Sequence, residues 1–213
     1  AVIKGKTEDG TDVHTRTKVI TGLQSRNSAK TLTYAFLYGA GNEKLSQIMI
    51  EDAKAAGINP PVGKGYILGK KTRTKLETGI NGLGKLIAVC QQRDKTKSWL
   101  KGLDGRKVQT SGQHSALNTL LQSAGAIVMK QALIELQFNI GPQQGLVDKN
   151  HLPIGWAYVA NVHDEFQMTA EPEVAPVLGE AARQAIVQAG ITLNLRCDLD
   201  GEYMIGDSWS ETH

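Results

Sequence analysis

Four side chains suited to holding a phosphorylated ligand recur at every fourth position of one short segment. They are two cations followed by two aromatic residues, Arg26, Lys30, Tyr34 and Tyr38. At 3.6 residues per turn, each step of four drifts by about 40°, so a helix would place all four in one stripe roughly 120° wide. Helix N-termini favour anions because free N–H groups point outward there. The stripe therefore predicts a grip for a triphosphate, with aromatic faces beyond it for a base or sugar. A surface helix with a snorkelling lysine and half-buried tyrosines would show the same spacing.

A pair of adjacent carboxylates, Asp164 and Glu165, stands where one apolar segment turns back on another. Residues 156–162 and 166–169 are expected to form the two strands of this hairpin. Mg²⁺ prefers one or two carboxylates together with substrate phosphates, and in two-metal phosphoryl transfer the ions lie about 3.5–4 Å apart. Asp164 is a candidate for one bridging ligand, but a single hairpin cannot supply both, so a further Asp from another strand is required. Ordinary turn chemistry would also explain adjacent carboxylates.

Composition limits the protein classes that remain possible. The chain has 213 residues, of which 40% are hydrophobic and 21% charged, so a packed core is feasible and wholesale disorder is not expected. The net charge of +3 permits nucleic-acid binding without requiring it. Cys90 and Cys197 lie far apart, which argues against a disulfide framework or a zinc site and fits a reducing compartment. No apolar run is long enough for a membrane span, and the N-terminal residues lack an apolar signal core.

The periodicity of apolar residues predicts a mostly helical α+β fold with a small antiparallel sheet. Asp104-Gly105 indicates a short hairpin, and residues 191–199 are expected to form a last strand. Helices are expected over 13–23, 29–41, 42–56, 70–92 (interrupted by glycines), 115–138 and 171–189.

In combination, these segments are more specific than any one of them. The sequence RNSAKTLTYAFLYGAG at 26–41, followed by VHDE at 162–165, resembles the family A (Pol I-like) DNA polymerases. Between them, GLDGRKV at 102–108 and HSALNTLLQSAGA at 114–126 resemble the phage replicative branch of that family, the T-odd coliphage type. The resemblance implies an incomplete polymerase architecture. A surface segment over 1–13 would precede helical fingers over 14–98 and the C-terminal part of a palm over 99–213.

The resemblance assigns the helical stripe to the incoming nucleotide. Arg26 and Lys30 would hold its triphosphate, and Lys30 would also protonate the leaving pyrophosphate. Tyr34 would pack against the sugar, Tyr38 would stack near the templating base, and His14 would contact a phosphate.

It assigns the acidic turn to metal and primer. Asp164 would be the second metal-bridging carboxylate, binding Mg²⁺, and Glu165 its catalytic neighbour near the primer end. His163 would contact the primer-terminal phosphate. Asn118 and Gln122 resemble the residues that check base pairing in the minor groove, where acceptors are common to all correct pairs. Further DNA-contact candidates, for which a structural role is equally open, are Arg106 and His114.

The implied activity is addition of dNMP from dNTP to a primer 3′-OH, directed by a template, in the cytoplasm of a phage-infected bacterium. The family's first metal-binding Asp lies on a strand upstream of the His14 region. Here Asp9 and Asp12 lie in a Gly/Thr-rich segment without such a strand. We therefore expect an N-terminal polymerase fragment, a natural subunit or the rest of a longer chain, to supply that Asp and the thumb, and the chain alone to be inactive.

Three alternatives remain at this point. Single-subunit RNA polymerases typically have Met in place of Tyr34 and Ser in place of Glu165, so both residues favour a DNA polymerase. A non-catalytic module that binds primer–template, or an unrelated α+β domain, would also fit.

One departure from the family is Ala35, where glycine is usual. The main interpretation requires that the stripe and the acidic turn face the same magnesium-bound triphosphate.

Overall fold

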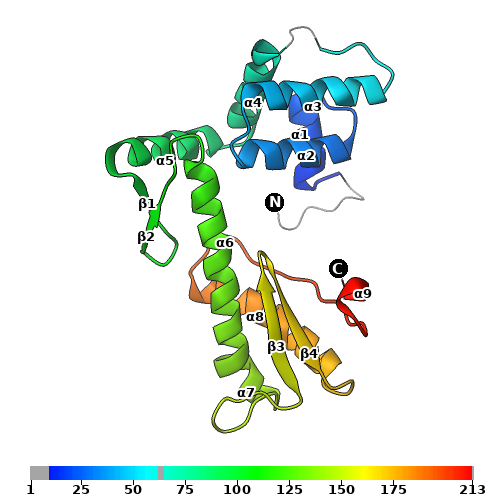
Figure 1. The fold of residues 1–213 in the computed structure, drawn as a ribbon, viewed down its shortest axis with the longest axis vertical. Coiled ribbons are helices and arrows are strands. Elements are labelled where there is room, and N and C mark those ends of the chain that lie inside the picture. The colour runs from blue at the N-terminus through cyan, green and yellow to red at the C-terminus, as the bar shows by residue number, and fades with distance from the viewer. Residues whose placement is uncertain (1–9, 62–64, 213) are drawn as a thin grey trace. The chain divides into compact units, whose positions relative to one another are not determined.

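The computed structural model describes residues 10–61 and 65–212, so most of the predicted segment 1–13 lies outside the described residues. The chain divides into two compact units (Figure 1). The first runs to Lys101 and includes Lys107–Leu121; the second comprises Gly102–Arg106 and Gln122–His213. The boundary between Leu121 and Gln122 falls within one long helix. The fingers and palm boundaries implied by the resemblance stay a prediction.

Five helices form most of the first unit's described part. Asp12 caps the first of them and Ser25 the second, each by accepting backbone N–H bonds through its side chain. The helical run expected over 70–92 is two helices, separated where glycine interrupts the pattern. In chain order the helices are α1 (Val13–Thr21), α2 (Arg26–Leu37), α3 (Asn42–Ala55), α4 (Tyr66–Gly79) and α5 (Leu83–Lys97).

The core of this unit lies among α2, α3 and α4. Leu32, Leu45 and Leu76 are fully buried there. Gly69 allows α4 to pack directly on the start of α3, because a Cβ at this position would lie 1.6 Å from the carbonyl oxygen of Asn42. The small residue therefore sets how closely these two helices approach.

A short antiparallel hairpin extends the first unit beyond the helices. Strand β1 (Trp99–Lys101) pairs with β2 (Lys107–Gln109), with Leu100 opposite Val108. Leu100 packs with Cys90 of α5 and with Ala116 at the start of α6 (Ala116–Ile134). These contacts fix the beginning of α6 to the first unit.

The second unit packs a hairpin against a helix. Strands β3 (Trp156–Val162) and β4 (Glu165–Ala170) are antiparallel, with an irregularity between Tyr158 and Ala160. Helix α8 (Ala175–Thr192) buries a row of alanines in the core shared with Trp156. The remaining elements are a π-helix (Glu135–Ile140) that continues α6, then α7 (Gly141–Gln143) and α9 (Trp209–Thr212).

A buried acidic residue begins the π-helix. Glu135 accepts hydrogen bonds from Gln131 (2.8 Å), Asn139 (2.5 Å) and Thr192 of α8 (2.7 Å). Burial by itself disfavours the charged form, but these donors outweigh it and lower the pKa of Glu135. The network joins the α6 continuation to the end of α8.

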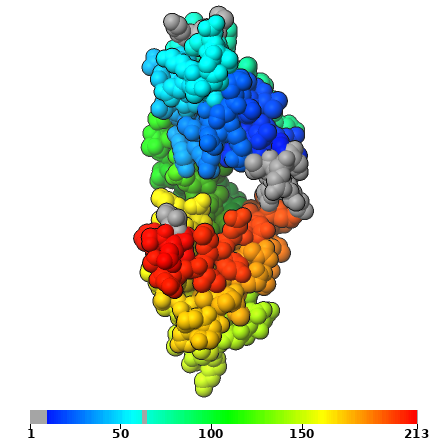
Figure 2. Space-filling view, turned by 90° about the vertical axis from the view of Figure 1, so that its right-hand side faces the viewer, coloured from blue at the N-terminus to red at the C-terminus, as the bar shows by residue number. Residues whose placement is uncertain are grey.

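The strand expected over 191–199 is wrong. Helix α8 continues to Thr192, and Asn194 then turns the chain with a φ of 52°. A strand needs a neighbour for its backbone groups, and in the described residues β3 and β4 pair only with each other. The C-terminal segment instead lies against α8, with Tyr203 on Gly179 and Leu199 on Gly190 (Figure 2).

The α+β class is confirmed: the described chain is mostly helical, with two small antiparallel hairpins. Within those same ranges, no helix combines the length and apolar character that crossing a bilayer would require.

The Gly69 contact gives a stability prediction. In Gly69→Ala the added methyl overlaps the Asn42 backbone, so α3 and α4 must separate, at a cost of about 3 kcal/mol. Gly125→Ala on α6 is the control, because its Cβ would meet no atom within 4 Å. There, helix propensity predicts a gain of about 0.5–1 kcal/mol. Urea unfolding followed by circular dichroism measures both, and equal stability of the two variants would contradict the packing.

Candidate functional site

The predicted stripe on α2 forms a row of side chains that face solvent. Lys30 is exposed, and the Tyr34 and Tyr38 side chains are 44% and 58% exposed. The two tyrosine rings lie stacked, 6.3 Å apart at 23°. His14 of α1 meets Tyr34 edge-on, with 5.8 Å between ring centroids. The structure therefore brings His14 to the stripe, and its contact with a phosphate stays a prediction.

Asp12 fixes the cationic end of this row. Its Oδ1 accepts the backbone N–H of His14 at 3.0 Å, and its Oδ2 accepts the Thr15 hydroxyl at 2.5 Å. The Arg26 guanidinium donates to the same Oδ1, from Nη2 at 3.0 Å and from Nε at 3.2 Å. The Thr15 hydroxyl, the Arg26 guanidinium and the neighbouring N–H groups hold the pKa of Asp12 far below its usual range. One carboxylate thus caps α1 and orients the first residue of α2.

Sequence reasoning treated Asp12 only as an unsuitable metal ligand and missed this role. The local signal was nevertheless present, because Asp followed by an apolar-periodic helix is a common N-cap arrangement. What the sequence could not show is the pairing with Arg26, which needs α1 and α2 side by side.

The surroundings of His14 disfavour its protonated form. Partial burial and the positive charges of Arg26 and Lys30 lower its pKa, against a smaller opposing effect of Asp12. Its Nδ1 atom is buried and has no hydrogen-bond partner among the described residues. Arg26, which is paired with Asp12, and the exposed Lys30 are therefore the cations at this end of the row, and His14 lies beside them as a further hydrogen-bonding group.

At its other end the row borders a hollow of about 490 Å³ in the first unit. Gly39 turns the chain there with a φ of 80°, and a Cβ on it would lie 2.6 Å from the backbone oxygen of His114. Arg73 of α4 lines the hollow and holds the end of α2. It donates to Asn42 at 2.8 Å and to the Ala40 carbonyl, and its guanidinium lies over the Phe36 ring.

The carboxylate pair lies at the tip of the β3–β4 hairpin. Val162 pairs with Glu165, and His163 turns the chain with a φ of 55°, a left-handed conformation suited to tight hairpins. Asp164 is exposed, whereas Glu165 is half-buried and accepts a hydrogen bond from Gln167 at 3.0 Å. Residues 10–61 and 65–212 contain no cluster of three His, Cys, Asp or Glu side chains able to hold a metal ion.

The stripe belongs to the first unit and the acidic turn to the second, so their convergence on one ligand stays a prediction. The candidate DNA-contact residues lie on and near α6. Asn118 is half-buried and Gln122 is exposed, four residues further along the helix. His114 is exposed just before that helix, and Arg106 is paired with Asp104 at 2.5 Å.

Comparison with known proteins settles the family. The model of DNA polymerase family A matches residues 3–211. The chain belongs to DNA polymerase family A.

Its relatives in this family include two phage enzymes. The DNA-directed DNA polymerases of Enterobacteria phage T3 and Escherichia phage T7 are each 37% identical to the chain over 221 aligned positions. The alignments cover 95% of this chain but 29% of each relative, so the chain spans less than a third of their length. Among solved structures, the POL domain of Pol1 from M. smegmatis, in complex with DNA primer-template and dNTP, has a TM-score of 0.57. The match covers 85% of this chain and 32% of the chain of that structure. At 16% sequence identity it supports the fold alone.

The Asp12 contacts of this family A chain predict a pH-dependent loss of stability. Asp12→Asn keeps an acceptor for the α1 cap but removes the charge that holds Arg26. Because the folded-state pKa lies below the ordinary value of about 3.9, the charge stabilises fully above pH 4 and less as the pH falls further. We expect Asp12→Asn to lower the Tm at pH 7 and the difference from the parent to shrink at pH 3.

Ser25→Ala is the matched control for this prediction. Ser25 is the neutral cap of α2, accepting from the N–H groups of Asn27 and Ser28, so its loss costs about 1 kcal/mol at either pH. Thermal unfolding by circular dichroism at pH 7, 5 and 3 compares the variants. An Asp12→Asn deficit that is as large at pH 3 as at pH 7 would refute the role of the charge.

Proposed function

We propose that the chain is the fingers and C-terminal palm portion of a DNA-directed DNA polymerase. It contributes to template-directed addition of dNMP from dNTP to a primer 3′-OH. Family membership supports this, as do two relatives named DNA-directed DNA polymerase. The observation that carries the proposal is the row of Arg26, Lys30, Tyr34 and Tyr38 along α2, with His14 of α1 packed edge-on against Tyr34.

In this proposal the row binds the incoming dNTP. Lys30 and Arg26 bind its phosphates, and His14 donates a hydrogen bond from a ring nitrogen. Tyr34 packs on the sugar, and Tyr38 lies beside the templating base. Lys30 also donates a proton to the departing pyrophosphate, a general-acid role worth typically 10²–10⁴ in rate.

The acidic turn would hold Mg²⁺. One exposed carboxylate, Asp164, fits an ion that takes most of its other ligands from phosphates and water. When bound, such ions stabilise the charge on the attacking and leaving oxygens. Two-metal phosphoryl transfer needs a second carboxylate, which a single hairpin turn does not supply across both ions, so we expect it from another part of the polymerase. We assign it, with the thumb, to an N-terminal polymerase region.

The primer–template DNA would meet four further side chains. Asn118 and Gln122 check base pairs through minor-groove acceptors, and His163 contacts the primer-terminal phosphate, next to Glu165. Weaker contributions come from His114 and Arg106. We place the reaction in the cytoplasm of a phage-infected bacterium.

Primer extension tests the proposal. The chain is assayed alone and with an N-terminal family A polymerase region that carries the first metal-binding Asp. We expect extension only in the second case. In the assembled enzyme, Lys30→Ala should lower kcat by about 10²-fold or more, and Asp164→Asn should abolish extension because it removes a metal ligand.

Lys44→Ala, which removes an exposed lysine from α3, is the control and should extend normally. Full activity of the isolated chain would refute the need for a second carboxylate. Unchanged activity of both Lys30→Ala and Asp164→Asn would refute the roles that we give to these two residues.

Nucleotide choice separates the remaining alternatives. A matched dNTP should tighten binding of a fluorescent primer–template, whereas a non-catalytic binding module would bind equally well without it. The assembled enzyme should incorporate dNTP in preference to rNTP. Preference for rNTP would instead indicate a single-subunit RNA polymerase.

A further inference from the structure

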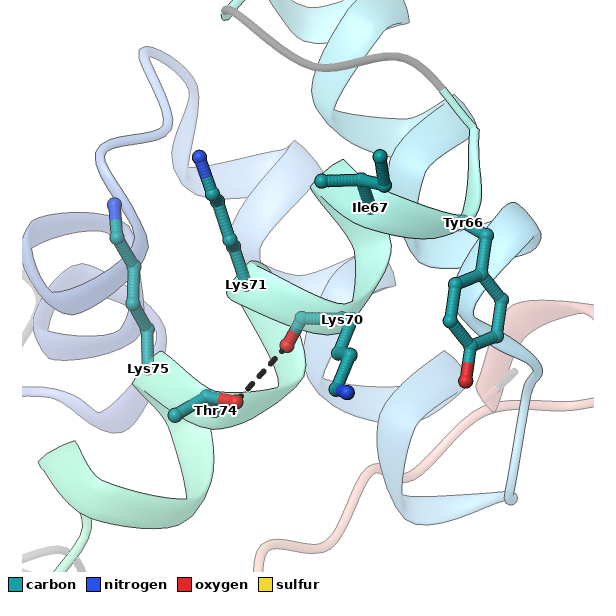
Figure 3. A pocket seen from close by; sticks show the side chains of 6 residues that line it. All are labelled: Tyr66, Ile67, Lys70, Lys71, Thr74 and Lys75. Carbon is teal, nitrogen blue, oxygen red and sulfur yellow. Dashed lines mark hydrogen bonds between the residues drawn. The ribbon is translucent and has the colours of Figure 1, made fainter.

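Helix α4 presents an unusual combination of side chains to solvent. Tyr66 and Ile67 are 60% and 61% exposed at its start. With the helix residues that follow, they form an open hollow of about 630 Å³ (Figure 3). Its lining consists of Tyr66, Ile67, Lys70, Lys71, Thr74 and Lys75, and we call this surface the α4 face. In Figure 3 the side chains of Tyr66 and Lys70 lie on one side of the helix, and those of Ile67, Lys71 and Lys75 on the other.

Some of the cationic side chains of α4 hydrogen-bond to neighbouring segments, whereas others extend into solvent. Arg73 turns inward to Asn42 and Ala40, and the Lys75 ammonium donates to the carbonyl of Thr21 at 3.1 Å. Among the described residues, Lys70 and Lys71 form no ion pair. The lining contains three lysines and no acidic residue. Positive charges on the α4 face together with the exposed Tyr66 ring suit a ligand that is anionic and carries a flat group able to stack on that ring.

Tyr66 also connects this face to the site already described. It lines the second hollow, together with Gly39, Asn42 and His114 at the C-terminal end of α2. Tyr38, the last residue of the proposed nucleotide-binding row, lies next to Gly39 in the chain. The two hollows therefore share one aromatic residue, and both belong to the first unit.

We propose that the α4 face binds the single-stranded template ahead of the primer end. The identity of the strand rests on the proposed function. Tyr66 offers a face on which a base stacks, and Lys70, on the same side of the helix, contacts an adjoining phosphate. Lys71, on the other side of the helix, contacts a further phosphate of the strand. Stacking and phosphate contact do not depend on base sequence. The template ahead of the primer end can have any sequence, so it requires binding of this kind.

Binding of single-stranded DNA tests this directly. Fluorescence anisotropy measures the affinity of the chain for labelled oligo-dT and for a blunt duplex of equal length. Tyr66→Ala should weaken oligo-dT binding about fivefold or more. The double variant Lys70→Ala/Lys71→Ala should lower the slope of log K against log salt by about 1.4, at roughly 0.7 per phosphate contact in a single strand. Neither should change duplex binding.

The matched control removes two exposed lysines from α3, Lys44→Ala/Lys54→Ala. It should leave the affinity for oligo-dT unchanged, and circular dichroism should show that all variants are folded. Equal losses in the control and the α4 variant would mean that general surface charge explains binding and would overturn the proposal. Poly-glutamate that displaces oligo-dT, together with no effect of Tyr66→Ala, would indicate an acidic polypeptide partner and would also overturn it.

Extension by the assembled polymerase separates failure of this proposal from failure of the proposed function. Templates with a long 5′ overhang should be used less well by the α4 variants, whereas a one-nucleotide overhang should be extended normally. Active enzyme with unimpaired variants on both templates would refute the α4 face alone. No extension by any form, with the oligo-dT losses intact, would refute the polymerase function and leave the single-strand site standing.

Discussion

The candidate nucleotide site depends on one buried carboxylate, that of Asp12. Without it, α1 would lose its N-cap and Arg26 its anchor, so His14 and Arg26 would no longer be fixed relative to each other. The Arg26–Asp12 ion pair contributes more to the position of the Arg26 guanidinium than to folding stability. A guanidinium that is already held in place loses less conformational entropy when it binds a phosphate. The same negative charge also limits how far the pKa of His14 falls, so one residue sets both geometry and electrostatics.

The opposite end of α2 is held by packing and by a second arginine. Gly69 brings the α4 backbone against Asn42, and from the same helix Arg73 reaches Asn42 and the Ala40 carbonyl. Carbonyls at a helix C-terminus lack partners within the helix, so a cation there is favoured. Helix α2 is thus tied at its start by Asp12 and just beyond its end by Arg73.

Spacing along the chain predicted the parts of the site that are local. Arg26, Lys30, Tyr34 and Tyr38 share a face because a helix of fixed period carries them, and the hairpin at Asp164 follows from two apolar segments around a polar turn. Contacts between distant residues were not predictable: Arg73 meets Asn42 across 31 positions, and Lys75 meets Thr21 across 54. The failed strand at 191–199 has the same cause. Its apolar residues predict a strand, but Ile191 belongs to α8 itself and Leu199 packs on Gly190 of that helix. Neither described hairpin pairs with the segment.

Composition alone would not have located a polyanion site, because the net charge of +3 is small and the 24 basic residues are spread along the chain. What distinguishes the basic residues of the first unit is whether they already have partners. Arg26, Arg73 and Lys75 bind carboxylate or carbonyl oxygens, and they fix helices. Lys30, Lys70 and Lys71 are exposed and form no ion pair with another described residue, and Lys70 lies on the same side of α4 as the exposed ring of Tyr66. Phosphate binding releases counterions from such cations without breaking a protein contact, so in this unit the lysines on α2 and α4, more than the arginines, are free to follow a moving nucleic acid.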